Sequence, residues 1–329
     1  MRFGPLPLEQ AVGAIVAHTV RGAGFTIKKG ARLTATDAEA LRLAGLTEVI
    51  VARYGDRDIA EDHAARVMAE AACGPGLRAD AAFTGRCNLR AEQGGVLRID
   101  TAAINRANAV DEALTIATPP DFARLEAGQL AATAKVIPYA ADGGAVEQVD
   151  ALLRGSMRLH PFQPMETTLV VTQTEGQKDS VIAKGAQAVR TRLNALGSPD
   201  PTVITTPHTA SAARAALEGA APSDLVLILG GSATSDRQDI APAAVVAAGG
   251  IIERFGMPVD PGNLLALGIY CEKPLVILPG CARSLALNGA DWVLERLAAR
   301  LPITGADIAG MGVGGLLKEI PSRPQPREK

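Results

Sequence analysis

Two glycine-containing turns in the second half of the chain have the composition of an anion-binding site. The turn at Gly230 and Gly231 follows the strand-like run 224–229, and the turn at Gly280 follows the run 274–278. A glycine turn at the carboxyl end of a buried strand lets backbone N–H groups approach an anion, and a helix beginning beyond it adds its positive end. The two turns predict a ligand that carries a phosphate and is contacted from two sides.

Asp239 is the leading acidic candidate, because it ends the first turn just before a predicted helix at residues 240–249. A carboxylate there can hold Mg²⁺ against a bound phosphate, since Mg²⁺ keeps most of its waters and takes one or two protein carboxylates. The position also suits a helix N-cap, for which Asp is among the best residues. Of its neighbours, Asp236 fits a turn residue and Arg237 fits a phosphate partner.

The second turn adds an arginine, a cysteine and a serine. Arg283 can make bidentate contacts to phosphate, and Ser284 is predicted to be the N-cap of the last helix. Cys281 lies inside the turn, where a helix N-terminus would lower its thiol pKa and allow contact with a sulfur- or metal-bearing ligand. A small residue that fits a crowded turn is the alternative interpretation of Cys281.

Two further segments are candidates on weaker grounds. The loop 256–263 contains two prolines and two glycines, and its Asp260 and Asn263 could contact the donor and acceptor edge of a heterocycle. Such a loop can also do nothing more than turn the chain. His208 follows a predicted strand at its carboxyl end, where it could bind an anion, move a proton, or be solvated.

The elements that must position these residues alternate between strand and helix from residue 167 onwards. The predicted strands are 168–172, 202–205, 224–229, 251–252 and 274–278. The predicted helices are 180–195, 209–219, 240–249 and 285–300. This alternation predicts an α/β fold with a doubly wound, mostly parallel sheet, in which ligands bind beyond the carboxyl ends of the strands.

The first half of the chain predicts a smaller mixed α+β region. A helix is expected over 36–44, with Thr36 as N-cap and Glu39 at capping-box spacing. A hairpin is expected at Gly94 and Gly95, and a helix over 100–117. The predicted domains are residues 1–76, 77–165 and 166–318, followed by a proline-rich tail at 319–329.

Bulk composition limits the class of protein. The chain has 329 residues, is 47% hydrophobic and only 3% aromatic, and has a formal net charge of -2. These values predict no nucleic-acid partner and no attraction to an anionic membrane. No run of apolar residues is long enough to span a bilayer, the start shows no signal-peptide pattern, and none of the four cysteines forms a CxxC pair. We therefore expect a cytoplasmic protein with reduced thiols.

The two turns resemble motifs of the molybdopterin-binding protein family. The stretch from Gly230 to Pro242 is similar to the family's glycine loop, which ends in an Asp-x-x-Pro-like turn. Residues 278–284, Leu-Pro-Gly-Cys-Ala-Arg-Ser, resemble its Leu-Pro-Gly-Asn-Pro segment. The resemblance covers residues 167–318, and weaker similarity in the first 150 residues rests on 8–17, 29–30 and 84–89.

Segments 256–267 and 279–292 resemble one subgroup more closely. That subgroup occurs upstream of, or fused to, a nucleotidyltransferase domain that attaches CMP to molybdenum cofactor. The tail residues 323–327 resemble the junction before that domain. The resemblance implies a molybdenum cofactor cytidylyltransferase as partner and, from its relatives, a homo-oligomer.

The resemblance also implies a ligand, molybdopterin or its molybdenum form, whose phosphate lies on the two turns and whose pterin extends into the crevice. Asp239 falls where the family has an acidic residue tied to metal insertion. The residues predicted to bind the cofactor are Thr172, Gly230, Gly231, Ser232, Asp236, Arg237, Asp260, Gly262, Asn263, Pro279, Gly280, Cys281, Arg283 and Ser284.

The sequence departs from the family at two acidic positions. The family's Thr-Gly-Asp-Glu-Leu loop is here Thr172-Gln-Thr-Glu-Gly176, and its second acidic position falls near Thr206-Pro-His208. Metal-assisted hydrolysis normally uses more than one fixed carboxylate. The departures therefore favour a protein that binds molybdopterin and presents it to a nucleotidyltransferase.

Two alternatives remain. The first is a molybdopterin molybdenumtransferase that inserts molybdate into adenylylated molybdopterin, with Asp239 and Glu175 as the catalytic residues and Asp239 as the ligand of Mg²⁺. The second is an unrelated α/β enzyme that acts on a sugar phosphate or a nucleotide.

Overall fold

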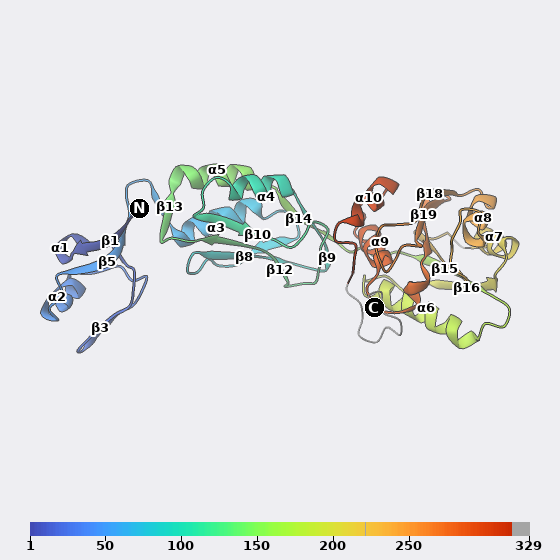
Figure 1. The fold of residues 1–329 in the computed structure, drawn as a ribbon, viewed down its shortest axis with the longest axis horizontal. Helices are drawn as coiled ribbons and strands as arrows, with labels where there is room; N and C mark the ends of the chain where they lie inside the picture. Colours follow the sequence, from blue (N-terminus) through green and yellow to red (C-terminus); the bar gives the residue numbers. More distant parts are fainter. Residues whose placement is uncertain (221, 318–329) are drawn as a thin grey trace. The chain divides into compact units, whose positions relative to one another are not determined.

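The chain divides into two units, Met1–His160 and Pro161–Lys329. The structure is a computed structural model that describes residues 1–220 and 222–317 (Figure 1). The predicted tail at 319–329 lies outside the described residues. No helix in the described ranges is both long enough and apolar enough to cross a membrane.

The first unit begins with a small antiparallel sheet of order β1-β5-β2 and a separate β3-β4 hairpin. Its core contains Leu6, Val16, Leu41 and Val51. The bounds are β1 Arg2–Pro7, α1 Leu8–Ala11, β2 Ile15–Val16, β3 Val20–Gly22, β4 Phe25–Ile27, α2 Ala35–Leu43 and β5 Glu48–Arg53.

Helix α2 begins earlier than the sequence pattern predicts. Its N-cap is Thr34, whose side chain accepts from the Asp37 N–H while the Asp37 carboxylate accepts from the Thr34 backbone N–H. Thr36 lies in the first turn. The sequence offers two overlapping capping boxes, and the earlier one forms, with Leu33 before it and Leu41 within the helix both buried.

The rest of the first unit packs helices against short sheets of order β10-β12-β8-β7, β11-β9-β14 and β13-β6. Figure 1 shows α3, α4 and α5 along these strands, and their apolar side chains share one core with them. The bounds are β6 Asp58–Ala60, α3 Glu61–Ala72, β7 Leu77–Ala79, β8 Arg86–Ala91, β9 Gly95–Ile99, α4 Thr101–Asn108, β10 Leu114–Ala117, β11 Arg124–Leu125, β12 Leu130–Val136, β13 Ala140–Asp142, α5 Gly143–Leu153 and β14 Met157–Pro161.

Two predictions for this region were wrong. The helix expected over 100–117 ends at Asn108, because the Asn108 side chain bonds both the N–H and the C=O of Ile116, at 2.8 and 2.9 Å, and joins the helix end to a strand. The glycines at 94 and 95 do not close a hairpin, because β9 has both its edges paired with β11 and β14.

The second unit contains a six-stranded sheet of order β16-β15-β17-β20-β19-β18. The four strands β16, β15, β17 and β20 are mutually parallel, and β19 is antiparallel to both of its neighbours. The α/β prediction is therefore confirmed, with a mixed sheet in which β19 was not predicted. The bounds are β15 Thr167–Gln173, β16 Thr202–Pro207, β17 Leu225–Leu229, β18 Ile251–Phe255, β19 Ala266–Tyr270 and β20 Lys273–Leu278.

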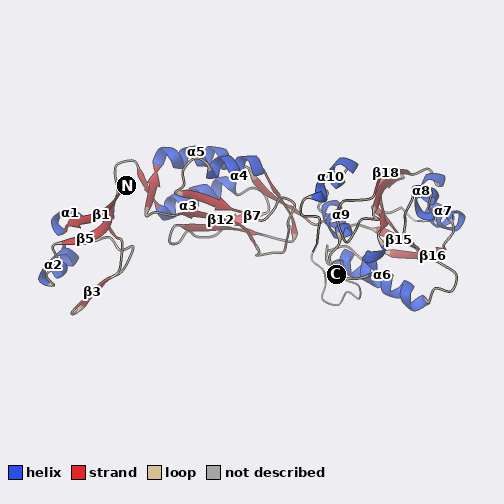
Figure 2. Ribbon diagram, viewed as in Figure 1, coloured by secondary structure: helices blue, strands red, loops and turns tan. Residues whose placement is uncertain are grey.

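Helices cover both faces of this sheet. Alternate strand residues such as Leu227 and Val276 pack with α6 and α9 in one core, while Val226 and Ile277 pack with α7 and α8 in another. Figure 2 shows α6 on one side of β15 and β16 and α7 on the other. The bounds are α6 Asp179–Asn194, α7 Ala210–Glu218, α8 Ile240–Ala247, the 3₁₀ turn η1 Gly280–Arg283, α9 Gly289–Ala298, α10 Gly305–Ala309 and the 3₁₀ turn η2 Gly310–Gly312.

The N-cap assignment for α2 can be tested with a pair of threonine substitutions. Thr34→Ala removes the hydroxyl that accepts the Asp37 N–H, so we expect the helix to lose about 1 kcal/mol of stability. Hydrogen exchange of the α2 amides would measure this as faster local opening. Thr36→Ala is the control, and an equal effect of both substitutions would contradict the assignment.

Candidate functional site

The carboxyl ends of the four parallel strands meet at one edge of the sheet. Gln173 of β15 pairs with Pro207 of β16, Val171 of β15 pairs with Leu229 of β17, and Leu229 pairs with Leu278 of β20. The chain leaves each strand on the same side. Both glycine turns therefore lie at this edge.

The turn after β17 packs closely against the end of β15. The Gly231 N–H donates to Thr172 Oγ1 at 2.8 Å. A Cβ at position 231 would lie 2.9 Å from the Thr172 carbonyl oxygen and 3.1 Å from Thr174 Cγ2, so only glycine fits without displacing the backbone. Among the described residues, the backbone N–H groups of Ser232 and Ala233 have no acceptor, and both residues are exposed. They form an open pair of donors at the sheet edge.

A histidine connects this turn to the neighbouring strand. His208 Nδ1 lies 2.7 Å from Thr172 Oγ1, and His208 Nε2 lies 2.7 Å from Ser232 Oγ. The His208 backbone N–H also donates to the Gln173 carbonyl at 2.8 Å, which fixes the residue beside β15. Burial lowers the pKa of His208, the Asp239 carboxylate opposes this shift and the Arg283 guanidinium adds to it.

Arg283 joins the two turns. Its guanidinium Nη2 donates to the carbonyl of Gly230. The side chain is half-buried, and burial lowers its pKa. Within the described part of the chain, no carboxylate pairs with it. A half-buried guanidinium without a counter-ion is a ready partner for an anionic ligand.

Gly185 of α6 makes room for Arg283. A Cβ at position 185 would lie 3.3 Å from Arg283 Cγ and 2.9 Å from Leu229 Cδ2. The helix can therefore approach the turn only because this position has no side chain. Arg283 and the end of β17 share the space that results.

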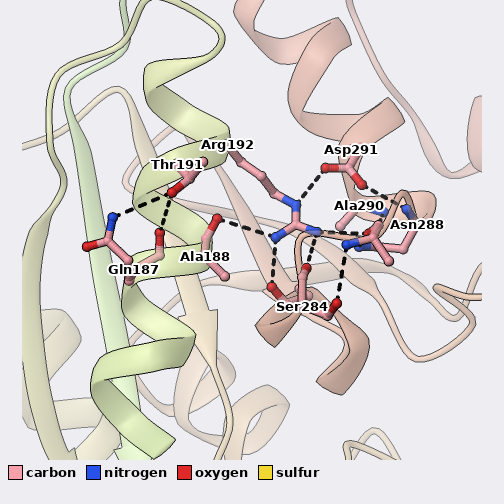
Figure 3. Close-up of polar contacts among 10 residues, drawn as sticks. Gln187, Ala188, Thr191, Arg192, Ser284, Asn288, Ala290 and Asp291 are labelled. Carbon is pink, nitrogen blue, oxygen red and sulfur yellow. Dashed lines mark hydrogen bonds and ion pairs between the residues drawn. The ribbon is translucent and has the colours of Figure 1, made fainter. Parts of the chain in front are cut away.

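Arg192 of α6 holds the whole segment after β20, and it is absent from the residues predicted from the sequence. Its Nε pairs with Asp291 at 2.6 Å, and its other nitrogens donate to the carbonyls of Ala282, Ser284 and Ala286 (Figure 3). The side chain is only 8% exposed. The helical spacing of the sequence could have indicated a buried arginine, because position 192 falls on the buried face of α6, which also carries Val189.

The acidic residues after the first turn act mainly on their own loop. Asp239 is the N-cap of α8, since its carboxylate accepts from the N–H groups of Ile240 at 2.8 Å and Ser235 at 3.2 Å. Asp236 is a turn residue that accepts from the Gln238 N–H at 2.7 Å. The Asp239 carboxylate thus lies on the helix N-terminus, where the sequence pattern predicts a bound anion.

Arg237 points away from this loop. Its guanidinium donates to the Ile252 carbonyl in β18 at 3.0 Å. Its role as a phosphate partner stays a prediction, and Arg283 is the arginine that contacts the glycine turn.

Two residues of the second turn differ from what the sequence pattern suggests. Burial raises the pKa of the Cys281 thiol, opposite to the lowering that a helix N-terminus would cause, and contact of Cys281 with a ligand stays a prediction. Ser284 does not cap the helix predicted over 285–300. That helix is α9, which begins at Gly289, and its N-cap is Asn288 with a capping box to Asp291. The segment between η1 and α9 is irregular and is held by Arg192.

The loop 256–263 is tied to the start of α9 and to the segment before the tail. The Gly289 N–H donates to the Pro261 carbonyl at 2.9 Å, and the Asp260 N–H donates to the Gly315 carbonyl at 2.8 Å. Gly262 is buried, and a Cβ there would lie 2.7 Å from the Gly289 nitrogen. This loop has a packing role.

Asn263, at the end of that loop, is exposed and donates weakly to the Met257 carbonyl at 3.4 Å. Contact of Asp260, Gly262 or Asn263 with a ligand stays a prediction.

Pockets open in this unit at the ends of β15 and β16 and beside the second turn. One, of about 650 Å³, is lined by residues 173–176 and 205–209, which include Glu175 and His208. Another, of about 800 Å³, lies between α6 and residues 280–285 and includes Arg283. The described residues contain no group of three or more His, Cys, Asp or Glu side chains placed to bind a metal ion.

The role of Arg192 can be tested by removing its charge. Arg192→Met removes the buried charge that pairs with Asp291 and the donors to the carbonyls of Ala282, Ser284 and Ala286, so we expect the free energy of unfolding of this unit to fall by about 3–5 kcal/mol. The single tryptophan, Trp292 in α9, reports this unit by fluorescence during urea unfolding. Arg214→Met is the control, because Arg214 forms an exposed pair with Glu218, and such pairs contribute at most about 1 kcal/mol. Equal losses in the two variants would contradict the assignment.

The lowered pKa of His208 predicts a pH dependence of stability. The unfolded imidazole has a pKa of about 6.5, and the folded state disfavours its protonation. The contribution of His208 is therefore complete above about pH 6.5 and is lost as the pH falls through the lower pKa of the folded state. His208→Gln should remove this part of the acid dependence in the same fluorescence measurement. An unchanged dependence would show that His208 is not its source.

Comparisons with known proteins give a short family match and distant structural likenesses. A model described as a domain of unknown function (DUF8806) matches residues 5–53. No curated protein matches the sequence significantly. The crystal structure of a molybdopterin biosynthesis MoeA protein from Pyrococcus horikosii is 11% identical with a TM-score of 0.32, over 91% of this chain and 75% of that chain. A molybdenum cofactor biosynthesis protein from Pyrococcus furiosus is 14% identical with a TM-score of 0.25, over 94% of this chain and 65% of that chain. At such TM-scores neither likeness places a residue of this chain in a known site.

Proposed function

We propose that the second unit binds the phosphate of molybdopterin, or of its molybdenum form, and holds the pterin for a nucleotidyltransferase in molybdenum cofactor biosynthesis. The observation that carries the proposal is the contact between Arg283 and the Gly230 carbonyl, which joins the two glycine turns at one edge of the sheet. The open N–H groups of Ser232 and Ala233 lie in the same turn. The identity of the ligand as a pterin rests on the sequence resemblance. The donors at the two turns support the binding of its phosphate.

The geometry favours binding over molybdenum insertion. The Asp239 carboxylate accepts the N–H of Ile240 as the cap of α8 and the N–H of Ser235 in the preceding loop. Glu175 is exposed in the loop beside the 650 Å³ pocket. A hydrolytic role with Mg²⁺ normally uses more than one fixed carboxylate, whereas a binding role uses the donors as they stand.

Further parts of the proposal rest on the sequence resemblance. They are a molybdenum cofactor cytidylyltransferase as partner, a homo-oligomeric state, and a doubly wound architecture of the molybdopterin-binding type. Residues 256–267 and 279–292 carry the resemblance to the subgroup associated with that transferase.

A direct test is a mass spectrum of the small molecules released from freshly purified protein, with metal analysis alongside. We expect a phosphorylated pterin. A nucleotide or a sugar phosphate in its place would support the unrelated α/β enzyme and overturn the proposal.

Substitution of Arg283 tests the site itself. Arg283→Ala should weaken pterin binding by about 1.5–3 kcal/mol, as expected for a lost hydrogen bond to a charged group. A fluorescence titration with molybdopterin would measure this. Arg214→Ala is a matched control, because that arginine forms an exposed pair with Glu218 in α7. Equal losses in both variants would remove Arg283 from its assigned role.

A further inference from the structure

We propose that Thr172, His208 and Ser232 form a hydrogen-bond chain of fixed direction, which makes the site select a tetrahedral oxyanion that carries no proton on its contacting oxygens. The inference deepens the proposed function and rests on it for the position of the anion.

The direction of these hydrogen bonds is set at Thr172, which is fully buried. Its Oγ1 already accepts the N–H of Gly231 at 2.8 Å. A buried hydroxyl also needs an acceptor for its own hydrogen. Among the described residues, the only acceptor in contact with this hydroxyl is His208 Nδ1, at 2.7 Å. Thr172 therefore donates to Nδ1.

The His208 ring also sets the direction of the hydrogen bond to Ser232. A neutral imidazole that accepts at Nδ1 has its proton on Nε2. Nε2 then donates to Ser232 Oγ across 2.7 Å. Ser232 is exposed, and its hydroxyl hydrogen is left to point at a ligand. The same direction prevents His208 from acting as the base that would make Ser232 a nucleophile.

Charged groups on two other elements face His208. Arg283, after β20, disfavours protonation of the ring, and Asp239, at the start of α8, favours it. Burial adds to the effect of Arg283, and the pKa of His208 lies below its ordinary value. The ring is therefore neutral at neutral pH, as the chain requires.

The unsatisfied polar groups of this turn are then donors, namely the Ser232 hydroxyl and the N–H groups of Ser232 and Ala233. The nearby Asp239 carboxylate is engaged by the N–H groups of Ser235 and Ile240. An oxygen with its own hydrogen would place that hydrogen against a donor, whereas a bare oxygen accepts from every group. Sulfate and the dianion of a phosphate monoester meet this condition.

The tautomer can be measured without any ligand. In protein labelled with ¹⁵N-histidine, long-range ¹H–¹⁵N spectra distinguish a protonated from an unprotonated ring nitrogen, and His208→Gln identifies the resonances. We expect the proton on Nε2 of His208. A proton on Nδ1 overturns the inference, and it does so whether or not the protein binds a pterin.

The selectivity can be measured with sulfate and methyl phosphate as probes. A phosphate monoester has a second pKa of about 6, so between about pH 7.5 and pH 5 the affinity for methyl phosphate should fall about tenfold relative to that for sulfate, which stays a dianion. The ratio cancels changes in the protein's own charge. Thr172→Val removes the hydroxyl that sets the direction of the hydrogen bonds. The ratio of the two affinities should then change less with pH. A constant ratio in the unmodified protein overturns the inference.

Two serine variants provide the matched comparison. Ser232→Ala removes the outward donor and should weaken sulfate binding about tenfold. Ser235→Ala lies in the same loop, is exposed, and has a hydroxyl that bonds to none of the described residues, so sulfate binding should be unchanged. Equal effects of the two variants overturn the inference. Sulfate binding that responds as expected, without any pterin binding, would contradict the proposed function alone.

Discussion

The arrangement of the candidate site depends on one buried guanidinium. Arg192 reaches from α6 across to the segment after β20 and holds three of its carbonyl groups and the Asp291 carboxylate. This segment contains the turn from which Arg283 extends to Gly230. Because a buried guanidinium has five donors in a rigid plane, it can fix an irregular stretch of backbone that has no strand or long helix to order it.

A second constraint is the close packing at the carboxyl ends of β15, β16 and β17. The Thr172 hydroxyl accepts from the Gly231 N–H and contacts His208, so a single buried side chain orients both the glycine turn and the imidazole. The absence of a side chain at Gly231 permits this approach. The backbone and the donors of the site are thus fixed by the same contact.

The sequence predicts the parts of this structure that depend on local pattern. The apolar run 225–229 is a strand buried on both faces, as expected for the interior of a parallel sheet, and both glycine turns follow strands that end at one edge. The carboxylate of Asp239 matches the N-cap alternative. Local pattern is sufficient in these cases because the determining neighbours are close in the chain.

The remaining features depend on residues that are distant in the sequence. Thr172 and His208 are 36 residues apart, and His208 and Ser232 are 24 apart, so no spacing rule could join them. Arg192 lies 99 residues from its carboxylate partner, and an arginine on a helix is ordinarily read as a surface residue. The early end of α4 similarly depends on the hydrogen bonds of the Asn108 side chain with the backbone of Ile116, eight residues further on.

Gly185 has a consequence for any attempt to stabilise the protein. Glycine within a helix costs about 1 kcal/mol relative to alanine, so propensity alone recommends replacing it in the 16-residue helix α6. The added methyl group would meet Leu229 and Arg283. A side chain at position 185 would therefore disturb both the packing of α6 on β17 and the position of Arg283, so helix propensity alone is a poor guide to stabilising substitutions here.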